Sequence, residues 1–347
     1  MATIADVART AGVSKSTVSN VFSQKRPISK EVSERVLAAA RKLDYKPNYW
    51  ARSLVSKTTH IIGINMPGER MKFSQFHLSL LNGVLYECSM SGYRLLVNAL
   101  TKTYLDDVPR LSSEPVDGDI LLDPVEHDSR IADRVRQGLP LVVIGRPHAE
   151  YESKVCYVDN DNVATGTMVV DYLLQFGHKR IMLLNASKGK TVSTDRGLGY
   201  RQALESAGQT FDPALLVYKD PNTPSAEYGY DVTKKMLKKH PDITAIIADT
   251  DKMALGVYRA AAELGLSIPG DLSVIAFSDE SVFSADFVPQ LTGVKLSAEQ
   301  LGHEAAKLLI NQCATGHRSV QRVLIQTELV ERGSCGPARP NESAPTN

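Results

Sequence analysis

The sequence has few cysteines and no long apolar run, and these two features exclude several classes of protein. Its four cysteines lie far apart and form neither a Cys-x-x-Cys pair nor a Cys/His cluster, so we expect no zinc site and no disulfide framework. The N-terminal region lacks the apolar segment of a signal peptide, and no stretch approaches the roughly 18 apolar residues that a membrane span requires. The sequence therefore predicts a reduced, cytoplasmic protein that binds no membrane.

The motifs of the common α/β enzymes are also missing. The chain has no Gly-x-Ser-x-Gly elbow, no Gly-x-Gly-x-x-Gly after its first expected strand, no P-loop and no His/Cys set at metal-ligand spacing. Asp251 and His303 could form an acid/base pair, but each lies in a motif that folding explains better. We therefore expect no enzymatic activity, no catalytic residue, no cofactor and no metal.

Basic charge is concentrated at the N-terminus. The chain has 347 residues, enough for two or three domains, and a formal net charge of only +1. Its first 58 residues hold eleven Lys or Arg against four Asp or Glu, a net charge of +7, which leaves −6 for the remainder. A basic head on a mildly acidic body is typical of a protein whose head contacts nucleic-acid phosphates and whose body does not.

The first 22 residues predict two short helices joined by a tight turn. Thr3 and Asp6 can form an N-cap pair for the first helix. Gly12 supplies the positive φ that the turn requires, and Ser14 can cap the second helix. Apolar residues recur at helical spacing in both: Ile4, Val7, Ala8, Ala11, Val18, Val21 and Phe22. This order is typical of a helix-turn-helix, whose second helix enters the major groove of DNA, although the turn alone would also fit two helices of a bundle.

A third helix and a short connecting helix are expected next. Ser29 can cap a helix whose apolar face completes a small three-helix core. Pro47 disfavours helix at the preceding residue, and Asn48 can cap a further helix that ends near Ser56. That segment is too short to be stable as an isolated helix, so it needs a partner or DNA to order it.

Five motifs follow one another in this region. They are Thr3-Ile4-Ala5-Asp6-Val7-Ala8, Ala11-Gly12-Val13-Ser14, Thr17-Val18-Ser19, Arg35-Val36-Leu37-Ala38-Ala39, and Tyr45-Lys46-Pro47-Asn48 with Ala51-Arg52-Ser53-Leu54. Together they resemble the signature of the lactose/galactose repressor (LacI/GalR) family of bacterial transcription regulators. The resemblance implies a sequence-specific DNA-binding protein, located at the nucleoid.

The resemblance also implies which residues contact DNA. The expected contacts are Lys15, Ser16, Thr17 and Asn20 in the major groove, with Ala51 and Leu54 in the minor groove. Lysine can donate to guanine and asparagine can pair with adenine, while an apolar wedge such as Leu54 unstacks a base step. Asn20 departs from the Arg or His often found at its position, so the half-site is expected to differ from the commonest one of the family. A phosphate contact for Lys15, and packing between hinge helices for Leu54, are the alternatives.

From His60 onward, expected strands alternate with helices. One series of strands covers 61–64, 93–97, 118–122 and 141–144, and a second covers 155–158, 181–184, 245–248 and 274–277. Helices are expected near 75–91, 128–137, 161–176, 194–207, 225–239, 251–264 and 297–313, the last five in the second series. This pattern predicts an α/β fold with two lobes, each a parallel sheet covered by helices, and a cleft at the strand ends.

The body resembles the effector-binding part of the same family, which is similar to periplasmic binding proteins. The matching motifs are Asp159-Asn160, Gly177-His178-Lys179-Arg180-Ile181, Arg196 with Gly199-Tyr200, Asp251 with Ala254-Leu255-Gly256, and Ile268-Pro269-Gly270-Asp271-Leu272-Ser273-Val274. We predict four parts: a DNA-binding head at 1–46, a hinge helix and linker at 47–59, a two-lobed effector-binding and dimerisation domain at 60–332, and a disordered tail at 333–347.

The family positions that face the cleft predict the effector contacts. They correspond to Phe73, Phe76, Arg146, Arg196, Thr250 and Ser278. A phenylalanine could stack on a sugar ring, although core packing is the more usual role for such a residue, and Arg196 could bind hydroxyls or a carboxylate. Arg196 could instead form a surface ion pair.

Two departures from the family pattern concern charge. Thr250 replaces a common asparagine and Ser278 replaces a common aspartate, whose loss adds +1 to the cleft. With Arg146 and Arg196 retained, this predicts an effector that carries a carboxylate or phosphate, such as a sugar acid, unless Asp279 turns in to compensate.

The function predicted is therefore a repressor whose affinity for a palindromic operator is controlled by a sugar or sugar acid. The chain lacks the leucine-heptad tail that indicates tetramers, so a homodimer is expected. A global catabolite regulator with a phosphocarrier protein as co-repressor is an alternative, and a solute-binding protein is another. The sequence does not determine the operator, the effector or whether the effector induces or co-represses.

Overall fold

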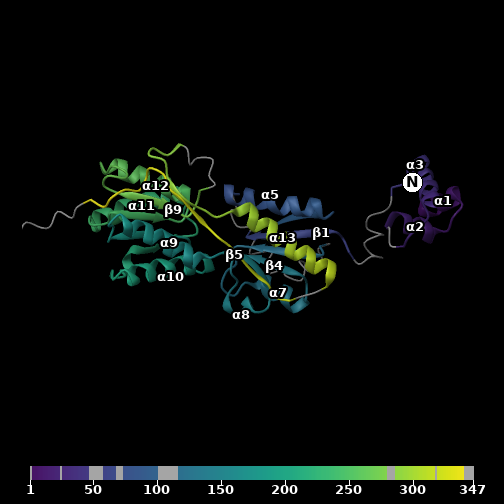
Figure 1. Cartoon of the computed structure of the whole chain (residues 1–347), viewed down its shortest axis with the longest axis horizontal. Helices are drawn as coiled ribbons and strands as arrows, with labels where there is room; N and C mark the ends of the chain where they lie inside the picture. The colour runs from purple at the N-terminus through teal and green to yellow at the C-terminus, as the bar shows by residue number, and fades with distance from the viewer. Residues whose placement is uncertain are drawn as a thin grey trace, which may run out of the picture. The chain divides into compact units, whose positions relative to one another are not determined.

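The computed structural model describes residues 2–23, 26–46, 58–67, 73–100, 116–279, 286–316 and 319–339. The chain divides into two compact units, 1–60 and 61–347 (Figure 1). None of the helices in the described ranges combines the length and apolarity that a membrane crossing needs.

The first unit contains the three predicted helices, α1 (Ile4–Ala11), α2 (Lys15–Ser23) and α3 (Lys30–Lys42). Thr3 and Asp6 form the expected capping box, and Gly12 ends α1 with a φ of 66°. The small core consists of Val7, Ala8, Ala11, Val18, Val36, Ala39 and Ala40. The predicted helix-turn-helix is therefore confirmed, because local capping and a shared apolar face both favour it.

The second unit consists of two lobes, each built on a six-stranded sheet. The first sheet is parallel throughout, in the order β11 (Arg322–Ile325), β5 (Cys156–Asn160), β4 (Leu141–Ile144), β3 (Gly118–Leu122), β1 (Ile61–Pro67) and β2 (Arg94–Leu100). The second has the order β12 (Glu328–Val330), β10 (Thr292–Lys295), β9 (Ser273–Ala276), β8 (Ala245–Ala248), β6 (Ile181–Asn185) and β7 (Leu216–Tyr218). Only β12 in this sheet runs antiparallel, to β10.

Helices cover both faces of each sheet. In the first lobe, α5 (Gln75–Met90) and α13 (Ala298–Thr315) lie side by side on one face, and α7 (Ser129–Gln137) packs on the other (Figure 1). A Cβ on Gly83 would lie 1.9 Å from the Glu299 carbonyl oxygen, so this close approach of α5 and α13 requires glycine. The short α8 (Ala149–Glu152) follows β4.

The second lobe is layered in the same way. One face carries α9 (Asn162–Gln175) and α10 (Thr191–Ser206), and the other carries α11 (Ser225–Lys239) and α12 (Asp251–Glu263). The short 3-10 helix η2 (Pro213–Leu215) precedes β7.

Two elements lie in a different lobe from the one predicted. The strand expected at 155–158 is part of β5 and pairs with β4 in the first sheet, and the helix expected at 297–313 is α13, which covers that same sheet. The chain therefore passes between the lobes three times, after β5, after β10 and after β11. Hydrophobic periodicity predicts that a strand is buried on both faces, but it does not predict which sheet the strand joins. The order of elements along the chain therefore gave the wrong lobe for these two elements.

The predicted disordered tail at 333–347 is wrong for the described residues 333–339. Ser334 is fully buried, and its carbonyl accepts a hydrogen bond from the Val274 N–H at 2.9 Å. The Gly336 N–H donates to Ser273 Oγ at 3.0 Å and the Ala338 N–H to the Phe176 carbonyl at 2.8 Å. Composition indicated disorder, but backbone groups of the second lobe are paired by this segment.

Candidate functional site

The first candidate site is the outer face of α2. Val18 is fully buried in the three-helix core, which fixes the opposite side of the helix toward solvent. Lys15 and Ser16 are exposed, while Thr17 and Asn20 are half-buried. Ser14 Oγ accepts a hydrogen bond from the Thr17 N–H at 3.0 Å, which caps the helix one residue before Lys15. The predicted major-groove residues therefore lie on the first turns of a capped helix.

Two predicted DNA contacts lie outside the described residues. These are Ala51 and Leu54, together with most of the predicted hinge at 47–59. Their minor-groove role stays a prediction.

Asn20 provides the sharpest test of the DNA-reading surface. Because asparagine reads adenine through two hydrogen bonds, Asn20→Ala should relax specificity at one base pair of each half-site and weaken binding there by about 1–3 kcal/mol. Lys42→Ala, at an exposed position on α3, is the control and should weaken all sequences equally. Selection of genomic fragments by each variant, followed by sequencing, measures this, and an unchanged motif for Asn20→Ala would contradict the assignment.

The second candidate site is a cavity of about 390 Å³ between the two lobes. Its walls include residues that follow β3, β5, β8 and β9, together with the start of α5 and the loop before α10. Ligands of parallel α/β sheets bind at these carboxyl ends of the strands, because the backbone and side chains of several loops converge there. The location agrees with the predicted cleft.

Five of the six predicted effector residues line this cavity. They are Phe73, Phe76, Arg196, Thr250 and Ser278. Phe73 is 46% exposed, whereas Phe76 is half-buried and packs against core residues of both lobes. Thr250 caps α12 by accepting the Met253 N–H, so its hydroxyl serves the helix as well as the cavity.

Arg146 is the exception, because it does not line the cavity. Its guanidinium makes two hydrogen bonds to Asp195, Nε to Oδ2 at 2.8 Å and Nη2 to Oδ1 at 2.7 Å. Asp195 raises the pKa of Arg146 further. Since Arg146 lies in the first lobe and Asp195 on α10, this ion pair joins the lobes, and the predicted ligand contact of Arg146 gains no support from the cavity lining.

Arg196 is buried at the cavity wall, with both a charge partner and an aromatic partner. It donates from Nη1 to Asp249 Oδ1 at 2.8 Å and from Nε to Asn162 Oδ1 at 3.2 Å. Its guanidinium carbon lies 4.4 Å from the centre of the Phe277 ring. Within the described part of the chain these bonds use two of its five N–H donors, so the guanidinium keeps donors with which it can bind a ligand.

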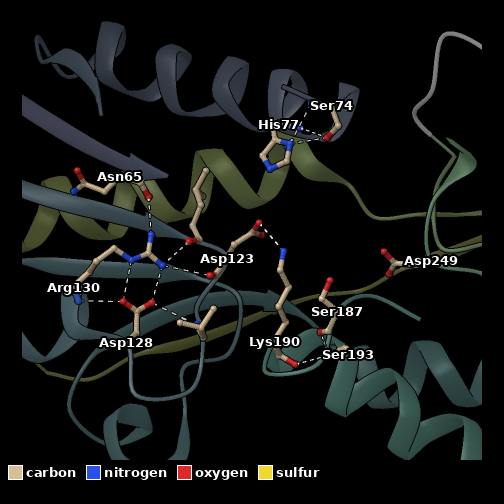
Figure 2. Close-up of polar contacts among 12 residues, drawn as sticks. Asn65, Ser74, His77, Asp123, Asp128, Arg130, Ser187, Lys190, Ser193 and Asp249 are labelled. Carbon is tan, nitrogen blue, oxygen red and sulfur yellow. Dashed lines mark hydrogen bonds and ion pairs between the residues drawn. The ribbon is translucent and has the colours of Figure 1, made fainter. Parts of the chain in front are cut away.

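An ion pair across the cavity joins the lobes in a second place. Lys190 Nζ, just before α10, lies 3.1 Å from Asp123 Oδ2, which follows β3 (Figure 2). Lys190 lowers the pKa of Asp123, and Asp123 raises that of Lys190, so both are charged at neutral pH. The Glu126 N–H also donates to the Gly189 carbonyl at 3.1 Å, so backbone as well as side chains connect these loops.

A buried arginine holds the loop that carries Asp123. Arg130 makes two hydrogen bonds to Asp128, Nε to Oδ1 at 2.9 Å and Nη2 to Oδ2 at 2.6 Å, and donates to the carbonyls of Leu122 and Asp123 (Figure 2). Asp123 has a φ of 51°, which is unfavourable for a residue with a Cβ. The carbonyl contacts of Arg130 support this conformation and thereby position the Asp123 side chain.

His77 adds a neutral donor at the start of α5. Its Nδ1 accepts the Ser74 N–H at 3.3 Å and lies 2.6 Å from the Ser74 hydroxyl, and the ring points toward Asp123 in Figure 2. Burial lowers the pKa of His77, so the ring is neutral at neutral pH. With Nδ1 as the acceptor, the proton lies on Nε2, which can donate to a ligand.

The charges of the cavity do not favour an anionic ligand. The walls hold five carboxylates and three cationic side chains, namely Asp123, Asp159, Asp249, Asp251, Asp279, Lys190, Lys252 and Arg196. Arg196, Lys190 and Arg146 each have a carboxylate partner, so the positive charge of the two retained arginines is offset within the protein. Burial raises the pKa of Asp159 to about 6, although the backbone N–H groups of Arg146 and Asn160 donate to it.

Sequence reasoning missed several cavity residues. They are His77, Asp123, Asp159, Asn162, Lys190, Asp249 and Phe277. A signal was available for four of these, since Asp123, Asp159, Asp249 and Phe277 each directly follow an expected buried strand or end it, where parallel sheets place their ligand contacts. Lys190 had no such signal, because its loop is irregular.

Comparison with known proteins identifies two matching family models. Residues 3–48 match the model described as bacterial regulatory proteins, lacI family, and residues 170–335 match the periplasmic binding protein-like domain. Among curated proteins, the chain is similar to the ribose operon repressor of Escherichia coli (strain K12), with 31% identity over 343 residues, which covers 96% of this chain and 100% of that protein.

Solved structures give the same picture. The chain is similar to the transcriptional regulator CelR in complex with cellobiose, with a TM-score of 0.75 and 28% identity over 96% of this chain and 100% of the other. It also shares the fold of the Lac repressor dimer bound to operator and an anti-inducer, with a TM-score of 0.81 at 24% identity over 96% and 98% of the two chains.

Proposed function

The chain belongs to the LacI family of bacterial regulatory proteins, and from this premise we propose that it is a dimeric repressor whose operator affinity is controlled by a neutral sugar. It is a DNA-binding regulator of transcription with an effector-binding body, and not an enzyme. The observation that carries the choice of effector is the composition of the cavity.

The cavity combines the groups that recognise sugar hydroxyls and ring faces. Carboxylates such as Asp123 and Asp249 accept hydrogen bonds from hydroxyls, while Arg196 and His77 donate to them. Phe76 and Phe277 supply apolar surface for the C–H faces of a ring. The excess of carboxylates over cations disfavours a sugar acid, and the volume of about 390 Å³ suits a small ligand. Two relatives, the ribose operon repressor and CelR in its complex with cellobiose, support the same class.

The contacts between the lobes provide a physical route for control. A ligand that binds one lobe arrangement more tightly than another changes the balance between them. In one arrangement Lys190 meets Asp123 and Arg146 meets Asp195, and in others these pairs separate. Such a ligand alters DNA affinity only if these arrangements differ in how they hold the two heads of a dimer.

An exposed apolar surface supports the dimer. Four large apolar residues of α5 are at least 45% exposed, namely Leu78, Leu85, Tyr86 and Met90, and Val97 on β2 is 44% exposed. A group of this size on one helix is more typical of a protein interface than of a monomer surface. Two copies joined in the first lobe would present two heads to a palindromic operator.

A thermal-shift panel tests the effector class. Neutral pentoses, hexoses and disaccharides are expected to include a ligand that raises the Tm of the full chain by several degrees, since binding to the folded state alone stabilises it. The matching sugar acids should have little effect, because a carboxylate would meet the excess negative charge of the cavity. Stabilisation by sugar acids alone would contradict the neutral-sugar proposal and would favour an anionic effector.

A further inference from the structure

Three potential metal ligands meet on the surface of the first lobe, away from the residues that line the cavity. They are His127, in the loop between β3 and α7, and His148 and Glu150, which follow β4. Their ligand atoms all lie within 4.8 Å of one another. Glu150 Oε1 is 3.4 Å from His127 Nδ1 and 3.8 Å from His148 Nδ1, and the two imidazole rings are 5.3 Å apart between centres.

These separations fit a shared metal ion better than hydrogen bonds. A nitrogen and an oxygen that form a hydrogen bond lie about 2.7–3.2 Å apart, which is shorter than either separation. Ligand atoms of a tetrahedral ion with bonds of about 2.0–2.2 Å are separated by about 3.3–3.6 Å. The cluster therefore needs only small side-chain movements to bind an ion.

The state of His148 is a second, independent indication. Its Nδ1 is buried and has no hydrogen-bond partner within the described residues, although a buried polar atom is normally satisfied. His148 is also the N-cap residue of α8, yet its side chain makes no capping hydrogen bond. When the ring proton lies on Nε2, the Nδ1 lone pair is left without a donor among the described residues, and a metal ion would satisfy it.

The surroundings leave the cluster open to solvent. The His127 side chain is 81% exposed, so an ion and a completing water molecule can reach the cluster.

We propose that His127, His148 and Glu150 bind one divalent transition-metal ion, such as Zn²⁺, with water as the fourth ligand. Two imidazoles and one carboxylate favour Zn²⁺, Co²⁺, Ni²⁺ or Cu²⁺ over Ca²⁺ or Mg²⁺, which prefer oxygen ligands alone. The ion joins the β3–α7 loop to the start of α8. The same two loops contact the second lobe, through Glu126 and Arg146 respectively, so the site stabilises the region where the lobes meet.

Titration of the full chain with Zn²⁺ and Co²⁺ tests the proposal. The native chain should bind one ion, with a higher Tm, and bound Co²⁺ should give the strong visible absorption of a tetrahedral site. His148→Ala and Glu150→Gln should each weaken binding at least tenfold and lose the Co²⁺ absorption. His148 is the N-cap residue of α8 and Glu150 is an exposed residue within it, and an unchanged Tm without metal would show that the variants fold.

His303→Ala is the matched control. His303 also lies near two carboxylates, with Nε2 3.1 Å from Glu87 and Nδ1 3.5 Å from Glu304, but no second imidazole of the described residues joins this cluster. This variant should bind Zn²⁺ as the native chain does. Native-like affinity in His148→Ala, or loss of binding only in His303→Ala, would overturn the assignment.

Discussion

Arg130→Met is expected to lower the Tm of the body by about 10 °C. Arg130 and Asp128 are 5% and 3% exposed in their side chains, so the substitution leaves a buried carboxylate without its cation. Breaking such a pair from one side costs about 3–5 kcal/mol, which for a domain of this size corresponds to a few degrees per kcal/mol. Three backbone carbonyls also lose a donor, those of Asn65, Leu122 and Asp123.

Arg136→Met is the control for this prediction. Arg136 is on the same helix and pairs with Asp133, but its side chain is 76% exposed. Solvent screens such a pair, so its loss should cost no more than about 1 kcal/mol. Thermal unfolding followed by circular dichroism separates the two variants, and similar Tm values for both would mean that the Arg130 network does not support the lobe.

Arg196→Met is expected to weaken effector binding by at least about 100-fold. The variant removes the N–H donors that we propose bind the effector, and hydrogen bonds to a charged group are worth about 1.5–3 kcal/mol each. It also leaves Asp249 without the partner that lies 2.8 Å away. Operator binding without effector should change little, because Arg196 lies in the body and the predicted base contacts lie on α2. The repressor should therefore stay on its operator at effector concentrations that release the native protein, if the effector is an inducer.

Arg201→Met tests whether this effect is specific. Arg201 is on the same helix, is half-exposed and pairs with Glu205 within that helix. It should keep native effector affinity in calorimetric titration with the sugar found in the thermal-shift panel. An Arg196→Met protein that still binds this sugar as the native chain does would remove Arg196 from the effector site.

The head could be predicted almost completely, because its determinants are close in sequence. The Thr3–Asp6 capping box, the left-handed Gly12 and the apolar face that contains Val7 and Val18 each act within a few residues or between adjacent helices. Local preference and tertiary packing favour the same helices here, so the structure matches the expectation.

The effector cleft could be predicted only in part. The family positions correctly predicted that Phe76 and Arg196 line the cavity. They also predicted this for Arg146, which instead forms an ion pair with Asp195. The partner of a charged side chain is 49 residues away for Arg146 and 53 residues away for Arg196. A local sequence pattern cannot show which carboxylate will pair with an arginine about 50 residues away. The sequence therefore did not show that carboxylates offset the charge of these arginines.

The sequence by itself determined the helix-turn-helix, the basic head, the alternation of strands and helices, and the class of protein. The first three depend on capping, periodicity and composition, which act over a few residues, whereas the class of protein follows from the resemblance of the head motifs to the LacI/GalR family. Only the tertiary structure decided that β5 and α13 belong to the first lobe, that residues 333–339 pack on the second, and which carboxylate neutralises each arginine. These depend on which buried surfaces and charges meet after the chain has passed between the lobes three times, and that outcome is a property of the whole fold.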